Sequence, residues 1–131
     1  MSRSGYSDDC DGWALICWRG AVESALRGKR GQAFLRELSE ALDALSEKRL
    51  IADNLERDGE VCAIGAVGRA RGLDMSNLDP YEPERLSEAF DIACAMAQEI
   101  SWVNDESGIY NETPEERFQR VRRWVNEKLA T

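Results

Sequence analysis

The sequence predicts an all-α protein, a single-domain bundle of about five helices, with one short β-hairpin as an open question. Apolar residues recur at helical spacing in several separate stretches. Residues that start or end helices, such as Gly28 and Pro114, stand at the ends of these stretches. The 131 residues are 43% hydrophobic and contain no repeat, low-complexity tract or linker. We therefore expect residues 1–131 to form one helical domain around its own core.

The first two helices are predicted to form an antiparallel hairpin. Residues 13–27 have apolar side chains at helical spacing beside a narrow polar stripe, so we expect a mostly buried first helix. Residues 32–45 have the clearest amphipathic period in the chain. Gly28 and Gly31 lie between the two helices, where glycine ends one helix and allows a tight connection to the next.

Two structures are compatible with residues 48–72. Asp58-Gly59 is a strong turn signal, which allows a short hairpin within the stretch from Leu50 to Ala63. Alternatively, Asp58-Gly59 is a break between a helical turn and a third helix, and we favour a helix from Val61 onward. Each glycine inside such a helix costs about 1 kcal/mol relative to alanine, so Gly65 and Gly68 indicate that another backbone packs closely here.

The next helical stretch begins after a loop rich in Asn, Asp and Pro. We expect the helix to start at Glu82 or Pro83, because proline fits the first turn. The helical period continues to about Val103, either as one long helix or as two that meet near Asp91. Residues 104–112 are polar and are predicted to form a loop.

The last helix has the strongest start signal in the chain. Thr113 can cap it, Pro114 suits the first turn, and Glu116 can bond back to the capping residue. The helix is predicted to end near Leu129. We expect its arginines to form the solvated side, opposite an apolar side, and they are Arg117, Arg120, Arg122 and Arg123.

The residue types argue against an enzyme. The chain has no histidine, which is the commonest acid–base residue and zinc ligand. Gly65-Ala66-Val67-Gly68 lacks the Gly-Lys-Ser/Thr of a phosphate-binding loop, and the four cysteines lack the paired spacing of a zinc site. Asp8, Asp9 and Asp11 could hold Mg²⁺ or Ca²⁺, but capping of the first helix explains them more simply. We predict no catalytic residue, no metal and no cofactor.

The first residues contain no apolar segment of a signal peptide, and no apolar run reaches membrane-spanning length. We therefore expect a cytoplasmic protein that does not bind membranes. Cys17, Cys62 and Cys94 each lie among small or apolar residues, which is typical of reduced thiols buried in a core.

Negative charge is concentrated in one part of the chain. The formal net charge is −8, and residues 73–112 alone carry ten acidic side chains and one basic one. These carboxylates could simply solvate a loop and the start of a helix, where negative charge is favourable. They could also form an acidic face that imitates a phosphate backbone and binds a nucleic-acid-handling protein. The candidate residues of this face are Asp74, Asp79, Glu82, Glu84, Glu88 and Asp91.

A smaller basic cluster supports an alternative function. Arg27, Lys29, Arg30 and Arg36 surround the predicted hairpin tip and could make the chain a small nucleic-acid-binding regulatory protein. The second helix would then have to be the recognition helix. Its exposed side would present acidic residues to the phosphates, which disfavours nucleic acid as a partner. These acidic residues are Glu37, Glu40 and Asp43.

Four motifs resemble a group of small uncharacterised proteins encoded by bacteriophages and prophages. They are Trp18-Arg19-Gly20-Ala21-Val22, the stretch from Gly28 to Leu38, the stretch from Glu60 to Gly68, and Asn104-Asp105-Glu106 with Thr113-Pro114-Glu115-Glu116-Arg117. The resemblance covers nearly the whole chain and brings no catalytic residue with it. It implies a phage context, in which small acidic helical proteins often bind host proteins, as anti-CRISPR and other anti-defence inhibitors do.

Taken with the charge distribution, the resemblance predicts a phage-encoded, non-enzymatic protein that binds and inhibits or modulates a host protein through the acidic face. A host defence protein or another nucleic-acid-handling protein is the expected class of partner. The sequence also leaves a homodimer open, because the small residues from Ala63 to Ala70 and the four tryptophans offer apolar surface.

Overall fold

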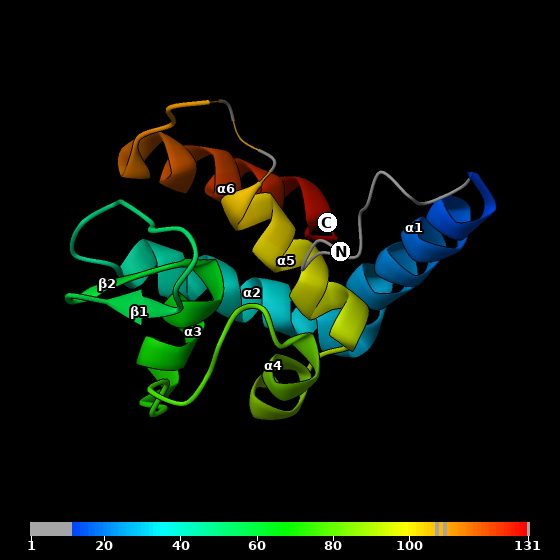
Figure 1. The fold of residues 1–131 in the computed structure, drawn as a ribbon, viewed down its shortest axis with the longest axis horizontal. Coiled ribbons are helices and arrows are strands. Elements are labelled where there is room, and N and C mark those ends of the chain that lie inside the picture. The colour runs from blue at the N-terminus through cyan, green and yellow to red at the C-terminus, as the bar shows by residue number, and fades with distance from the viewer. Residues whose placement is uncertain (1–11, 107, 109, 131) are drawn as a thin grey trace.

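The computed structural model describes residues 12–106, 108 and 110–130, with side chains from Leu15 onward. This part of the chain contains six helices and one two-stranded sheet, so the predicted all-α fold with a short hairpin is confirmed. In chain order the elements are α1 (Gly12–Arg27), α2 (Lys29–Ala44), β1 (Glu56–Arg57), β2 (Glu60–Val61), α3 (Ala63–Arg71), α4 (Pro83–Phe90), α5 (Cys94–Asp105) and α6 (Pro114–Lys128). Figure 1 shows α2 running through the middle of the molecule, where it contacts α1, α3 and α6.

The hairpin of α1 and α2 is tighter than predicted. Gly28 alone separates the two helices, so α2 begins at Lys29 rather than at residue 32. A Cβ atom on Gly31 would lie 1.9 Å from the backbone oxygen of Ala25. Only glycine allows the two backbones to approach so closely at this point.

The expectation of a mostly buried first helix is wrong for the first half of α1. Val22 and Leu26 are buried, but Ile16 is 64% exposed and Leu15 is 38% exposed. In Figure 1, α1 projects from one end of the molecule, so only its later turns meet other helices. The expectation of a buried thiol at Cys17 fails for the same reason, since Cys17 is exposed.

Residues 56–71 combine the two alternatives that the sequence left open. Asp58 and Gly59 both adopt positive φ, at 54° and 83°, as a two-residue hairpin turn requires. The turn pairs β1 with β2 in antiparallel register, with Glu56 opposite Val61. The helix α3 then begins at Ala63, and the Cys62 sulfur accepts a hydrogen bond from the Gly65 N–H at 3.4 Å.

The small residues of α3 pack within the chain itself. A Cβ atom on Gly65 would lie 1.9 Å from the backbone oxygen of Leu55, and one on Gly68 would lie 2.3 Å from the sulfur of Met75. The predicted close approach of another backbone is therefore present. All residues from Ala63 to Gly68 are buried, so this part of the stretch has no apolar surface left for self-association.

The stretch from Pro83 to Asp105 forms two helices rather than one. Asp91 adopts the left-handed conformation and ends α4, and the Ser87 hydroxyl donates to the Ile92 oxygen across the break. The second helix, α5, ends at Asp105 and so includes two residues that were expected in the loop. The capping box of α6 is formed as predicted by Thr113 and Glu116.

The buried apolar side chains of all six helices form one core. Phe34 of α2 and Phe90 of α4 meet edge to face, with ring centroids 6.3 Å apart. This contact anchors α4. The largest fully buried side chains of the core include Leu35, Leu38, Leu42, Ile64, Leu86, Met96 and Ile100.

The two glycines of α3 give a test of this packing. Gly65→Ala should destabilise the protein by about 3 kcal/mol, because the added methyl group meets fixed backbone at Leu55. Gly68→Ala should cost at most about 1 kcal/mol, because the Met75 side chain can move away. Urea unfolding at neutral pH measures both, and equal losses for the two variants would contradict this account.

Candidate functional site

Two of the six predicted acidic-face residues shape the loop before α4. The carboxylate of Asp74 accepts hydrogen bonds from the Ser76 hydroxyl at 2.7 Å and the Ser76 N–H at 3.0 Å, which together lower the pKa of Asp74. The carboxylate of Asp79 accepts from the Tyr81 N–H at 2.8 Å. Both side chains stay exposed, but each has a local structural role.

Two other residues of the predicted face pair with the protein's own arginines. Glu82 lies 3.7 Å from Arg85, one turn further along α4. Asp91, at the opposite end of α4, lies 3.4 Å from Arg30. These side chains are about half exposed or more, so each pair is weak and screened by solvent.

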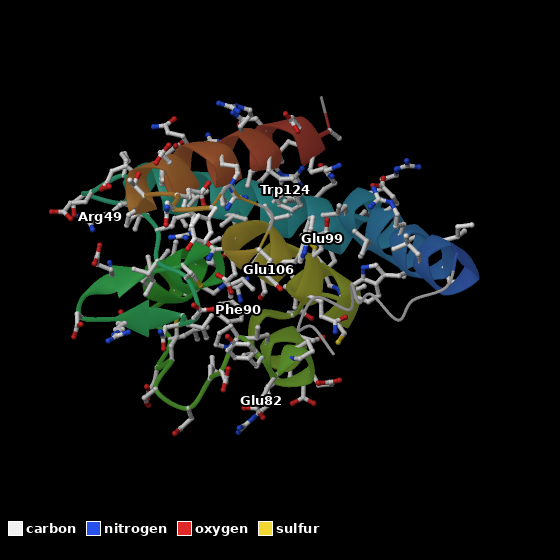
Figure 2. The ribbon with its side chains drawn as sticks, turned by 45° about the horizontal axis from the view of Figure 1, so that its top comes forward. Arg49, Glu82, Phe90, Glu99, Glu106 and Trp124 are labelled. Atoms are coloured by element: carbon white, nitrogen blue, oxygen red, sulfur yellow. The ribbon has the colours of Figure 1, made fainter. Side chains whose placement is uncertain are left out.

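Glu84 and Glu88 form the centre of the acidic surface that remains. They lie one turn apart on the exposed side of α4, whose opposite side is buried through Pro83, Leu86 and Phe90. Within the part of the chain that the structure describes, neither carboxylate has a hydrogen-bond or ion-pair partner. In Figure 2, Glu82 lies at the edge of the molecule, whereas Phe90 lies toward its middle.

The negative potential of α4 also acts on its neighbour Cys94. Burial raises the pKa of this half-buried thiol, and the nearby carboxylate of Glu84 raises it further. The thiol therefore stays protonated at neutral pH and is a poor nucleophile. Burial raises the pKa of Cys62 to about 12, so the same holds for that residue.

A groove that the sequence did not predict lies beside the start of α4. It has a volume of about 380 Å³ and lies between residues 53–56 and residues 75–81. Three carboxylates line it, namely Asp53, Glu56 and Asp79. All three have partners within the chain, since the Tyr81 hydroxyl donates to Asp53 at 3.1 Å, the Tyr81 N–H donates to Asp79 at 2.8 Å, and Arg69 pairs with Glu56 at 3.1 Å. No sequence signal could identify this groove, because eighteen residues separate its two sides along the chain.

The positive charge of the basic tip, which is the predicted cluster of Arg27, Lys29, Arg30 and Arg36 at the α1–α2 connection, is partly neutralised. Arg27 pairs with Glu23 at 3.2 Å, and Arg30 pairs with Asp91. Lys29 and Arg36 are exposed. The two surfaces predicted as alternatives therefore meet at the Arg30–Asp91 pair, where their charges offset each other.

Two of the three acidic residues named above on α2 also have internal roles, whereas Glu40 is exposed. Glu37 accepts two hydrogen bonds from Arg71, at 2.6 and 2.7 Å, which lower the pKa of Glu37. Asp43 accepts two from Arg122, at 3.0 and 3.1 Å, which lower the pKa of Asp43. These ion pairs link α2 to α3 and to α6.

The main polar network of the fold is centred on the buried side chain of Asn104. Its Oδ1 atom accepts from the Ala63 N–H at 3.1 Å, and its Nδ2 atom donates to the Ile51 oxygen at 2.9 Å. Its backbone oxygen accepts from Arg117 at 3.0 Å and from Arg120 at 3.2 Å. One residue at the end of α5 thus holds α3, α6 and the segment before β1 together.

The expectation that the arginines of the last helix lie on its solvated side is wrong for Arg117, Arg120 and Arg122. Their side chains are only 15%, 22% and 22% exposed, whereas Arg123 is exposed as predicted. Arg120 donates to both carboxylate oxygens of Glu112, at 2.7 and 3.0 Å, and Arg117 lies 3.5 Å from the same carboxylate. The loop before α6 brings Glu112 to this place, where its side chain is 6% exposed. Arg117 and Arg120 turn inward because Glu112 and the carbonyl groups at the end of α5 need donors.

Within residues 12–106, 108 and 110–130, no three Cys, Asp or Glu side chains lie where they could hold a metal ion together. Asp8, Asp9 and Asp11, considered above as ligands or caps, lie outside the described residues. None of the described helices combines the length and the apolar character needed to cross a bilayer.

No protein-family model, curated protein or solved structure matches this chain. The candidate site therefore rests on the geometry of the molecule alone. That geometry selects the exposed side of α4, with Glu84 and Glu88 at its centre and the carboxylate-lined groove beside it.

Asn104→Ala tests the polar network. The substitution leaves the Ala63 N–H and the Ile51 oxygen without their partners, so we expect a loss of roughly 2 to 4 kcal/mol in the free energy of unfolding. Asn77→Ala is the matched control at an exposed loop position and should change stability by less than about 0.5 kcal/mol. Chemical denaturation compares the two, and an unchanged midpoint for Asn104→Ala would refute the role of this residue.

Glu112→Gln tests the carboxylate by its dependence on pH. The hydrogen bonds from Arg120 lower the pKa of Glu112 below its ordinary value of 4.5. A carboxylate whose pKa is lowered by folding stabilises the folded state at pH values above its ordinary pKa. This stabilisation is lost as the pH falls through the lowered pKa. The variant should be less stable than the wild type by about 2 kcal/mol at pH 7, and the difference should shrink below pH 4.5. A difference that stays constant down to pH 2.5 would show that charge is not its cause.

Proposed function

We propose that this chain is a phage-encoded, non-enzymatic interaction protein that binds a host protein and inhibits or modulates it. The binding surface is the exposed side of α4, with Glu84 and Glu88 at its centre. The phage context rests on the sequence resemblance, and the mode of binding rests on the charge of α4. We name the class of partner by its chemistry, as a nucleic-acid-handling protein with a basic surface, which includes defence nucleases such as CRISPR effectors.

The observation that carries this proposal is the unpaired charge of Glu84 and Glu88. Most of the other carboxylates discussed above bond to a loop or to an arginine of the same chain. Two adjacent carboxylates without a cation raise the local negative potential, which attracts a positively charged surface and speeds association. Carboxylates spaced along a helix can take the places that phosphates occupy on a nucleic-acid-binding protein.

The rigidity of α4 supports the same function. Leu86 and Phe90 are fully buried, and Phe90 packs on Phe34 of the central helix. The carboxylates therefore stand on a helix that is fixed to the core. A fixed surface loses less conformational entropy on binding than a loop does, so it binds more tightly for the same contacts.

The basic tip supports the alternative function less well. Two of its four cations pair with carboxylates of the same chain, and the acidic α4 ends beside it at Asp91. DNA or RNA approaching Lys29 and Arg36 would meet that negative charge.

Charge reversal tests the proposal. Purified Glu84→Lys/Glu88→Lys should lose at least about tenfold in affinity for a partner captured from lysate of the bacterial host, because like charges then face each other. The capture is done with and without nuclease, so that a partner bridged by nucleic acid is recognised. The affinity for the purified partner is then measured at low and high salt, and wild-type binding should weaken as salt rises.

Glu40→Lys/Glu127→Lys is the matched control, since it changes the net charge equally at exposed positions on α2 and α6. It should keep most of the binding. Equal loss in both double variants would show that only net charge matters, and full binding by the α4 variant would overturn the proposed surface.

A further inference from the structure

The helix α1 is apolar on its outer side as well as on its inner side. Val22 and Leu26 are buried on the inner side. On the outer side Ile16, Cys17, Gly20 and Ala21 are all exposed, and Ile16 is 64% exposed. Arg19 is the only charged residue from Leu15 to Val22. Helix sides that carry mostly apolar residues are normally buried, so this outer side has the composition of a contact surface.

The outer side also has the shape that a second helix needs. Ile16, Gly20 and Ser24 follow each other at intervals of one turn, which places them in one row. A Cβ atom on Gly20 would meet nothing within 4 Å, so the space above the middle of the row is open. The short side chains at Gly20 and Ser24 allow another helix to lie close to the backbone of α1.

The charges beside this row match a second copy of the same helix. Arg19 and Glu23 flank the row on one side and lie one turn apart. Glu23 pairs with Arg27 of the same helix at 3.2 Å, but its side chain is 41% exposed, so an arginine of a second copy can also reach the carboxylate. When two copies of α1 pack antiparallel about a twofold axis near Gly20 and Ala21, Arg19 of each copy lies opposite Glu23 of the other. The twofold axis makes this pairing occur twice. In a parallel pair, by contrast, the twofold axis places the two copies of Arg19 on opposite sides of the contact, so Arg19 would not meet Glu23.

We propose that the outer face of α1, defined by Ile16, Cys17, Gly20, Ala21 and Ser24, binds the same face of a second copy in an antiparallel, twofold-symmetric dimer. The proposal is independent of the acidic surface on α4. It replaces the small-residue stretch of α3 as the dimer surface, because that stretch is filled by Leu55 and Met75 of the same chain.

Sedimentation equilibrium of the full chain tests the dimer. The wild type should be dimeric at micromolar concentration, and Ile16→Glu should be monomeric. Because Ile16 is exposed, the variant should keep its fold, which circular dichroism checks. A wild type that remains monomeric at several hundred micromolar, or an Ile16→Glu variant that remains a dimer, would overturn the proposal.

A charge swap tests the antiparallel arrangement. Arg19→Glu and Glu23→Arg should each weaken the dimer by about tenfold, because each puts two like-charged pairs across the twofold axis. The double variant Arg19→Glu/Glu23→Arg should recover most of the wild-type affinity, since the opposite charges face each other again. Failure of the double variant to recover would contradict the predicted register.

Disulfide trapping gives an independent measure of direction. Gly20 lies near the axis, so Gly20→Cys should form an interchain disulfide under mild oxidation. Ser24→Cys should not, because an antiparallel pair separates the two copies of residue 24 by about 9 to 12 Å along the helix axis. Both variants carry Cys17→Ser to remove the native exposed thiol. Crosslinking at both positions would indicate a parallel pair, and crosslinking at neither would indicate another interface; either result refutes the proposed geometry.

Discussion

The fold depends on one buried amide. The side chain and backbone oxygen of Asn104 bond to the segment before β1, to the start of α3 and to two arginines of α6. These segments come from three separate parts of the sequence, and each would otherwise bury an unsatisfied polar group. In the low dielectric of the interior such bonds are strong, and a missing partner is costly. Asn104 is therefore the residue through which α5 holds the segment before β1 and the start of α3 to α6.

This network also determines which charges reach the surface. Arg117 and Arg120 turn inward to Asn104 and Glu112, and Arg71 and Arg122 bind carboxylates of α2. The protein thus uses several of its cations to join its own helices. Arg71 also donates to the Phe90 oxygen at the end of α4, but none of these arginines pairs with Glu84 or Glu88. The acidic surface is therefore a consequence of the way in which these arginines pair with carboxylates and carbonyl groups elsewhere in the protein. It is also smaller than the six-residue face that the sequence predicted, because Asp74, Asp79, Glu82 and Asp91 all have partners within the chain.

The two proposed contact surfaces differ in their chemistry. The side of α4 is charged, rigid and open, as suits a partner that is met by electrostatic attraction and bound reversibly. The outer side of α1 is apolar, with one matched pair of charges, as suits a permanent symmetric contact. Figure 1 shows α1 reaching out at one end of the molecule, while α4 lies beside the core. A dimer formed through α1 would present two acidic surfaces, which would increase its avidity for a partner that carries two sites.

The sequence by itself determined the local structure of this protein. The hydrophobic period identified the helices, Thr113 with Glu116 identified the cap, and Asp58-Gly59 identified the turn, because each of these depends on neighbours within a few residues. The glycines of α3 indicated a close backbone contact but not its partner, Leu55, which lies ten positions from Gly65. Only the tertiary structure decided which polar groups meet. The pairs Arg30–Asp91 and Arg122–Asp43 join residues that are 61 and 79 positions apart. Helical period shows which side of a helix is apolar, but it does not show whether an arginine on that helix meets water or a distant carboxylate. For the same reason the period of α1 showed an apolar helix and could not show that half of it would extend beyond the core.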